Sequence, residues 1–168
     1  MVINLLPRVK TNFCEVNFTE VGQLRSFVTK QWSEWGQQRL VTRDHIDTFS
    51  NLTDNHQWIH EDEDRCMTES PYGALVAHGF FILVLLPSLL PRESFVVTGH
   101  AQRIVRGSDH FRFPSPVFPD DIVQARVRLR DVRISENGKG IILIRDTEIW
   151  STTGTKPAVT CSLQLQYF

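Results

Sequence analysis

The spacing of apolar residues changes along the chain from helical to alternating. In the first half, residues 21–30 carry apolar side chains at helical spacing, which predicts one helix. Thr42 is a suitable N-cap for a second helix, with one apolar face formed by Ile46, Phe49 and Leu52. The first half of the chain is therefore predicted to be largely helical.

The longest apolar run lies in the middle of the chain. Residues 79–90 are apolar on every side, so a helix formed by them would be buried all round. Pro87 has no backbone N–H to donate and is expected to bend or end this helix near its last turn. We predict that this segment is the central, buried helix of the fold.

From Ser94 onward the apolar residues alternate with polar ones. The alternation is clean in residues 123–130 and 159–167, and residues 141–150 follow a hairpin turn at 137–140. These segments predict long antiparallel strands. One long helix against such a sheet is an α+β fold.

Three arginines, Arg126, Arg128 and Arg130, lie on the polar face of the first of these strands. A row of cations on a sheet can bind phosphate groups. Alternating charge is also how a one-sided antiparallel sheet meets water. We favour the solvated face and keep phosphate binding as the alternative.

The length and composition fit one globular domain. Residues 1–18 show no clear periodicity and are expected to form an N-terminal arm, followed by a domain over residues 19–168. The net charge of −1 gives no electrostatic basis for binding nucleic acid or an anionic membrane. Three widely spaced cysteines predict neither a disulfide framework nor a zinc knuckle, and no stretch predicts a membrane span or a secretory signal. We expect a cytoplasmic protein.

Residues able to move protons lie shortly before the central helix. Asn55, His56 and His60 precede an acidic patch and a turn at residues 70–73, and the apolar run then opens with Gly79. The start of a helix offers free backbone N–H groups and a positive dipole end to a carbonyl group. A proton-transfer group and an oxyanion site in one segment indicate chemistry on a carbonyl compound.

Two of these histidines have a spacing that also occurs in metal sites. His56 and His60 are four residues apart, which on a helix would direct two imidazoles at one ion. No glutamate follows His56, and no third ligand occurs at a recognisable spacing. We predict neither a metal nor any other cofactor.

Four blocks of the sequence resemble one enzyme family. Residues 53–60 read TDNHQWIH, residues 70–73 read SPYG, residues 77–80 read AHGF and residues 112–117 read RFPSPV. They are similar in sequence and spacing to the MaoC-like (R)-specific enoyl-CoA hydratase and dehydratase family, and in particular to its nodulation protein N branch. The resemblance extends over roughly residues 20–165, which is nearly the whole chain.

This resemblance implies a specific fold and assembly. Members of the family have a hot-dog fold, in which a curved antiparallel sheet wraps around one long central helix. Domains of this size usually form homodimers, with the acyl-thioester site at or near the subunit interface. The implied substrate is an acyl thioester of coenzyme A or of an acyl carrier protein, as in fatty acid or polyketide metabolism.

The resemblance also implies a reaction and the residues that perform it. In the family, an Asp and a His in the pattern Gly-Asp-x-x-x-x-His hold the water that adds to C3 of a 2-enoyl thioester. A proton is then transferred to C2, and the reverse reaction is dehydration. A glycine N–H binds the thioester oxygen. The corresponding residues here are His60 for the acid/base and Gly79 for the oxyanion donor, with His78 expected to hold the entrance of the helix beside Gly79.

The aspartate of this pattern is absent. The family's Gly-Asp falls on Asp54 and Asn55, so Asn55 occupies the position of the catalytic carboxylate. An amide can orient water but cannot accept its proton at neutral pH.

Three explanations remain open. In the first, Asp54 serves as the carboxylate. In the second, His60 is the single acid/base and Asn55 an orienting group, which suits dehydration or a double-bond isomerase. In the third, the chain is an inactive thioester-binding partner subunit. We expect a hydro-lyase that acts on the C2–C3 bond of the thioester.

Overall fold

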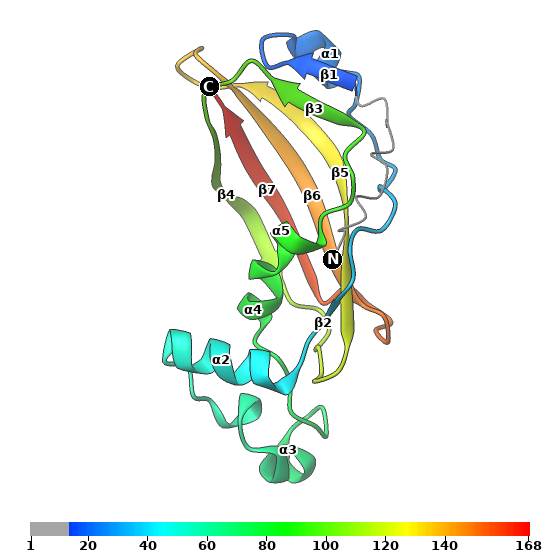
Figure 1. Cartoon of the computed structure of the whole chain (residues 1–168), viewed down its shortest axis with the longest axis vertical. Coiled ribbons are helices and arrows are strands. Elements are labelled where there is room, and N and C mark those ends of the chain that lie inside the picture. The colour runs from blue at the N-terminus through cyan, green and yellow to red at the C-terminus, as the bar shows by residue number, and fades with distance from the viewer. Residues whose placement is uncertain (1–13) are drawn as a thin grey trace, which may run out of the picture.

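The core of the molecule is a five-stranded antiparallel sheet. A computed structural model describes residues 14–168. The strands lie in the order β2, β5, β6, β7, β4. Their bounds are Arg39–Leu40 (β2), Ile122–Ile134 (β5), Ile141–Ser151 (β6), Val159–Tyr167 (β7) and Arg103–Arg112 (β4). The sheet is strongly curved around a short helical segment (Figure 1), which confirms the expected hot-dog architecture.

The alternating segments form the three central strands as predicted. In β5, the apolar side chains of Val123, Ala125, Val127 and Leu129 are buried on the concave face. The β5–β6 hairpin closes at the predicted turn, where Gly138 has a φ of 69°, a conformation that suits glycine. The sheet is therefore specified largely by its two-residue period.

The central helical segment is split into two short helices. α4 (Gly79–Val84) and α5 (Leu86–Leu89) meet at Leu85, and Pro87 lies in the first turn of α5. Pro87 lacks the N–H needed to continue the hydrogen-bond ladder of α4. In the part of the chain that the structure describes, no helix is long and apolar enough to cross a membrane.

The prediction that this segment is buried on every side is wrong for the single chain. Phe80 and Val84 are 60% and 59% exposed. They are four residues apart on α4, so they belong to one face of the helix. Phe81 and Ile82 are buried against the sheet. One apolar face of α4 is thus open to solvent.

Three short elements lie beyond one end of the sheet (Figure 1): α2 (Arg43–Thr53), the 3-10 helix η1 (Trp58–His60) and α3 (Glu63–Glu69). Thr42 caps α2 as predicted, since its Oγ1 accepts a hydrogen bond from the His45 N–H at 3.2 Å. Ile46 is buried, but Leu52 is 79% exposed, so the predicted apolar face of α2 is not buried along its whole length. Ser50 in the last turn is buried, so burial at this end of α2 is confined to one side of the helix.

The first predicted helix ends early. α1 covers only Val21–Arg25, and the chain then runs beside β5. Thr29, Ser33 and Gly36 donate backbone N–H groups to carbonyl oxygens of β5 at 3.0, 2.9 and 2.8 Å. Bonding to this sheet edge replaces the helical bonds that the apolar spacing predicted up to residue 30.

Part of the predicted N-terminal arm forms a β-strand. Residues 1–13 lie outside the described part of the chain, whereas Cys14–Asn17 form β1 and pair in parallel with β3 (Phe95–Thr98). This small second sheet was not expected from the sequence. The domain boundary at residue 18 stays a prediction.

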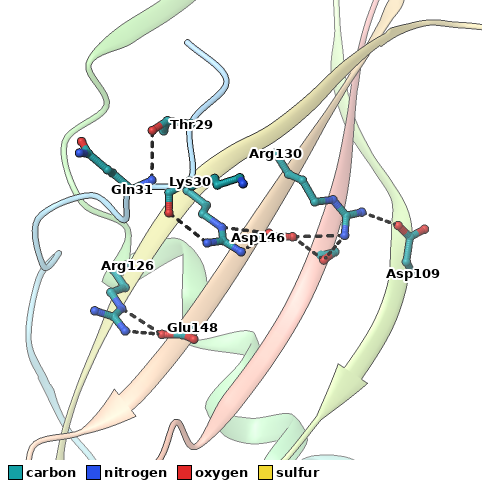
Figure 2. Close-up of polar contacts among 10 residues, drawn as sticks. Thr29, Lys30, Gln31, Asp109, Arg126, Arg130, Asp146 and Glu148 are labelled. Atoms are coloured by element: carbon teal, nitrogen blue, oxygen red, sulfur yellow. Dashed lines mark hydrogen bonds and ion pairs between the residues drawn. The ribbon is translucent and has the colours of Figure 1, made fainter. Parts of the chain in front are cut away.

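The arginines of β5 are each paired with a carboxylate. Arg126 contacts Glu148 at 2.7 Å, and Arg130 contacts Asp109 at 2.8 Å (Figure 2). Arg128 lies 3.0 Å from Asp146. The positive charge is compensated within the face, which agrees with a solvated sheet and weakens the phosphate-binding alternative.

Two glycines provide a matched test of the packing between the β5 edge and α5. At Gly36 a Cβ would overlap the Leu89 carbonyl oxygen and lie 2.6 Å from the Pro91 nitrogen, both of which are backbone atoms. We expect Gly36→Ala to lower the free energy of unfolding by about 1–3 kcal/mol, measured by urea denaturation. Gly22→Ala in α1 meets nothing within 4 Å. It should be neutral or raise stability by up to about 1 kcal/mol, because alanine favours a helix. Equal stability of the two variants would contradict the packing described.

Candidate active site

A cavity of about 570 Å³ lies between the loop that follows α2 and the N-terminal end of α4. Its apolar lining includes three phenylalanines, Phe49, Phe80 and Phe113. Its polar lining consists of Thr53, Asn55, His60, Tyr72, His78 and Ser115. An apolar cavity with a few convergent polar groups is the usual form of a small-molecule site.

His60 is held in one orientation by the backbone. Its Nδ1 lies 2.8 Å from the Val76 carbonyl oxygen. Because a carbonyl oxygen can only accept, Nδ1 must carry the proton, and Nε2 of the neutral ring keeps its lone pair. The Val76 N–H in turn donates to the Ile59 carbonyl oxygen at 3.2 Å. The two segments therefore fix each other, and His60 is left with one nitrogen able to accept a proton.

His78 is a buried neighbour of His60. The two rings are stacked with their centroids 3.7 Å apart. The Nε2 of His78 lies 3.2 Å from the Asn55 carbonyl oxygen and 3.5 Å from the Ser50 Oγ. Burial lowers the pKa of His78, against an opposing contribution from its hydrogen bond to Asn55. His78 is thus a neutral ring at neutral pH.

Gly79 is the first residue of α4, with His78 as its N-cap. Backbone N–H groups in the first turn of a helix have no acceptor within the helix. The Phe113 ring lies close above Gly79, since a Cβ placed there would be 2.7 Å from the Phe113 Cδ1. The absence of a side chain at Gly79 therefore allows the Phe113 ring to approach its backbone closely.

Asp54 and Asn55 differ in where they are placed. Asp54 ends α2 in the left-handed conformation, with φ of 53° and ψ of 31°. Its side chain is 100% exposed, and its Oδ1 lies 3.6 Å from the His56 Nε2. Asn55 lines the cavity, whereas Asp54 does not. Asn55 is therefore placed at the cavity, whereas the carboxylate of Asp54 faces solvent.

His56 is not part of the cavity. Its Nδ1 lies 2.6 Å from the Glu61 Oε1, so its ring is directed at the acidic loop. His60, by contrast, faces Val76. The two histidines do not converge as a metal-binding pair would, and within residues 14–168 there is no group of three or more possible metal-ligating side chains.

The structure brings together four of the predicted site residues, Asn55, His60, His78 and Gly79, around one cavity. It adds Thr53, Tyr72 and Ser115, which the sequence analysis did not assign to the site. Tyr72 and Ser115 lie within the blocks 70–73 and 112–117, so the motif blocks themselves were the available signal. Thr53 lies one turn after Phe49 on the same face of α2.

Comparison with known proteins identifies relatives over most of the chain. The family model described as "MaoC like domain" matches residues 27–148. The 3-hydroxyacyl-thioester dehydratase Z of Mycobacterium tuberculosis is 32% identical over 128 residues, which is 76% of this chain and 82% of that protein. Nodulation protein N of Rhizobium meliloti is 32% identical over 154 residues, covering 88% of this chain and 89% of that protein.

Solved structures share the fold. A MaoC-like dehydratase from Rhodospirillum rubrum superposes with a TM-score of 0.68 at 18% identity, over 86% of this chain and 95% of that chain. The (R)-hydratase from A. caviae superposes with a TM-score of 0.61 at 21% identity, over 80% of this chain and 92% of that chain. The family match and the two curated relatives together show that the chain belongs to the MaoC-like domain family.

Proposed function

We propose that the chain is an acyl-thioester hydro-lyase, which hydrates a 2-enoyl thioester or dehydrates a 3-hydroxyacyl thioester. The observation that carries the proposal is the hydrogen bond from His60 Nδ1 to the Val76 carbonyl, because it leaves Nε2 as a proton acceptor in the cavity. Gly79 and Asn55 line the same cavity. The relatives' names, which include a thioester dehydratase and an (R)-hydratase, support this reaction class.

In the proposed hydration, His60 Nε2 takes a proton from a water molecule while the water oxygen bonds to C3. The electrons of the double bond move toward the thioester, and the charge that develops on its oxygen is bound by the Gly79 N–H. His60 then returns the proton to C2, so one water is added and no proton is lost. Asn55 orients the water. The reverse sequence removes water from a 3-hydroxyacyl thioester.

Two alternatives use the same cavity. A double-bond isomerase would need only the removal and return of a proton by His60. An inactive thioester-binding partner subunit is favoured by one observation, the amide of Asn55 in the cavity together with the outward position of Asp54. A general base contributes about 10²–10⁴-fold, so loss of a carboxylate alone can reduce hydration severely.

The carrier of the acyl group is coenzyme A or an acyl carrier protein in this proposal. We also propose that the protein acts in the cytoplasm. All three cysteines, Cys14, Cys66 and Cys161, are free thiols, which suits a reducing compartment.

Hydration of a short trans-2-enoyl-CoA, followed by loss of enoyl absorbance, tests the reaction. We expect His60→Ala to abolish the activity and His56→Ala, the matched control outside the cavity, to retain it. Asn55→Asp should raise the rate by up to about 10²–10⁴-fold, because it restores a carboxylate beside His60. Asp54→Asn should change little, since that side chain faces solvent.

The outcome separates the open explanations. Loss of activity in Asp54→Asn would reinstate Asp54 as the base. A silent wild type that gains activity with Asn55→Asp would favour the partner-subunit or isomerase alternative. Absence of hydration activity in both the wild type and Asn55→Asp, with the fold intact, would overturn the hydro-lyase proposal.

We further propose that two copies of the chain form a homodimer through β4 and the open face of α4. Within the described residues, β4 is paired with β7 alone, so its other edge is free. Val105 on this strand is 63% exposed, and Phe80 and Val84 are exposed on α4. An unpaired edge strand with exposed apolar side chains is a natural pairing surface, and a symmetric dimer would cover the same patch on both copies.

A charged substitution on β4 tests the dimer. We expect the wild type to be dimeric in analytical ultracentrifugation and Val105→Glu to shift it toward monomer, because a buried unpaired carboxylate opposes association. Ile134→Glu is the control, since Ile134 is also exposed, at 57%, but lies at the end of β5. A monomeric wild type, or a Val105→Glu dimer as stable as the control, would contradict the proposal.

A further inference from the structure

We propose that His78 is a positioning residue that holds His60 and Asn55 in register with Gly79; the inference rests on the proposed function. His78 is 3% exposed and lies outside the proton-transfer steps given above. Its ring is nevertheless in contact with both polar residues that the proposed reaction uses. Its role in this proposal is to fix their geometry.

The contacts of His78 join three separate segments. Its Nε2 reaches the Ser50 Oγ in α2 at 3.5 Å and the Asn55 carbonyl oxygen in the following loop at 3.2 Å. Its ring face lies against the His60 ring of η1, with centroids 3.7 Å apart and planes inclined by 29°. One buried side chain therefore sets the position of the loop that carries Asn55 and the orientation of His60.

The segment that carries His78 is itself fixed by backbone hydrogen bonds to η1 and to the loop between β4 and β5. Ala77 donates its N–H to the Val117 carbonyl at 2.8 Å, and the Val76 N–H donates to Ile59 at 3.2 Å. Val76 supplies the carbonyl for His60 Nδ1, and Gly79 follows His78 directly. Residues 76–79 are thus held in place by the backbone. Within this segment, the His78 side chain contacts His60 and Asn55.

The protonation of His78 fits this role. A carbonyl oxygen accepts only, so Nε2 of His78 carries the proton donated to Asn55. A second proton on this ring would place two cations face to face when His60 is charged. Of the charged groups acting on His78, Glu61 raises its pKa and His60 lowers it, and burial lowers it most. The neutral ring can remain stacked on His60 whether or not His60 has taken a proton.

His78 does not serve as a second base. Its Nε2 is engaged with Asn55 and Ser50, and its Nδ1 is buried with no hydrogen-bond partner among the described residues. Neither nitrogen is free to exchange a proton with a substrate in the cavity. The contacts of His78 are therefore those of a residue that positions its neighbours.

Two substitutions separate the ring contact from the hydrogen bond. His78→Phe keeps a stacked ring and removes the donor to Asn55. His78→Gln keeps an N–H donor and removes the ring. The matched control is His100→Phe, because His100 also has a buried, unpartnered Nδ1 and packs edge-on against Tyr167 at 4.9 Å, on a segment that does not line the cavity.

The first readout is the tautomer of His60, observed by NMR of protein labelled with ¹⁵N-histidine. This measurement needs no turnover, so it stands even if the hydro-lyase proposal fails. We expect the Nδ1–H form in the wild type, in His78→Phe and in His100→Phe, and a mixture of tautomers in His78→Gln. An unchanged His60 signal in folded His78→Gln would overturn the proposal.

The second readout is the split between kcat and KM in the enoyl-CoA assay, run in the Asn55→Asp background if the wild type is silent. We expect His78→Phe and His78→Gln to lower kcat by about 10²-fold with KM little changed, as for a small misplacement of reacting groups. If the two His78 variants have the same kcat per folded molecule as His100→Phe, His78 is only a packing residue and the proposal is overturned.

Discussion

The hydrogen bond between His60 Nδ1 and the Val76 carbonyl determines what the cavity can do. A backbone carbonyl has no proton to give, so this contact allows one neutral tautomer and leaves Nε2 as the basic atom. A side-chain partner such as a hydroxyl would permit either tautomer. Because Val76 is hydrogen-bonded to Ile59 and its neighbour Ala77 to Val117, the acceptor is fixed by η1 and by the loop that joins β4 to β5. The chemistry of the cavity thus depends on the support that η1 and this loop give to residues 76–79.

The backbone at the end of α2 explains why the carboxylate of Asp54 is displaced from the cavity. Asp54 holds the left-handed conformation that ends the helix, a position that favours glycine and tolerates aspartate. The next residue, Asn55, lines the cavity. The left-handed residue at the end of α2 is therefore Asp54, and the residue that follows it at the cavity carries an amide in place of a carboxylate. Moving the carboxylate inward would require a different helix end, which is a larger change than a side-chain rotation.

Sequence reasoning was reliable where one local rule decides the structure. Alternation predicted β5 to β7, and the cap at Thr42 predicted the start of α2, because both depend on neighbouring residues alone. It failed where tertiary contacts decide: hydrogen bonds to the β5 edge replace those of α1 after Arg25, and Leu52 in α2 is exposed to solvent. For the site, family resemblance supplied Asn55, His60 and Gly79. The stacking of His60 on His78 could not be read from the sequence, since the two rings meet only when residues 76–79 dock beside η1.

With an amide at position 55, His60 carries every proton transfer in the proposed reaction. That arrangement still balances, because the proton taken from water on one side of the double bond can be returned at C2, and the reverse holds for dehydration. What a second carboxylate would add is rate, since it would share the proton acceptance with His60 in the transition state. The stacked neutral ring of His78 and the N–H of Gly79 do not replace a base. In the proposal His78 positions His60, and the Gly79 N–H stabilises the charge that develops on the thioester oxygen. In the proposed reaction, Asn55 therefore affects the rate more than it affects which bond of the substrate reacts.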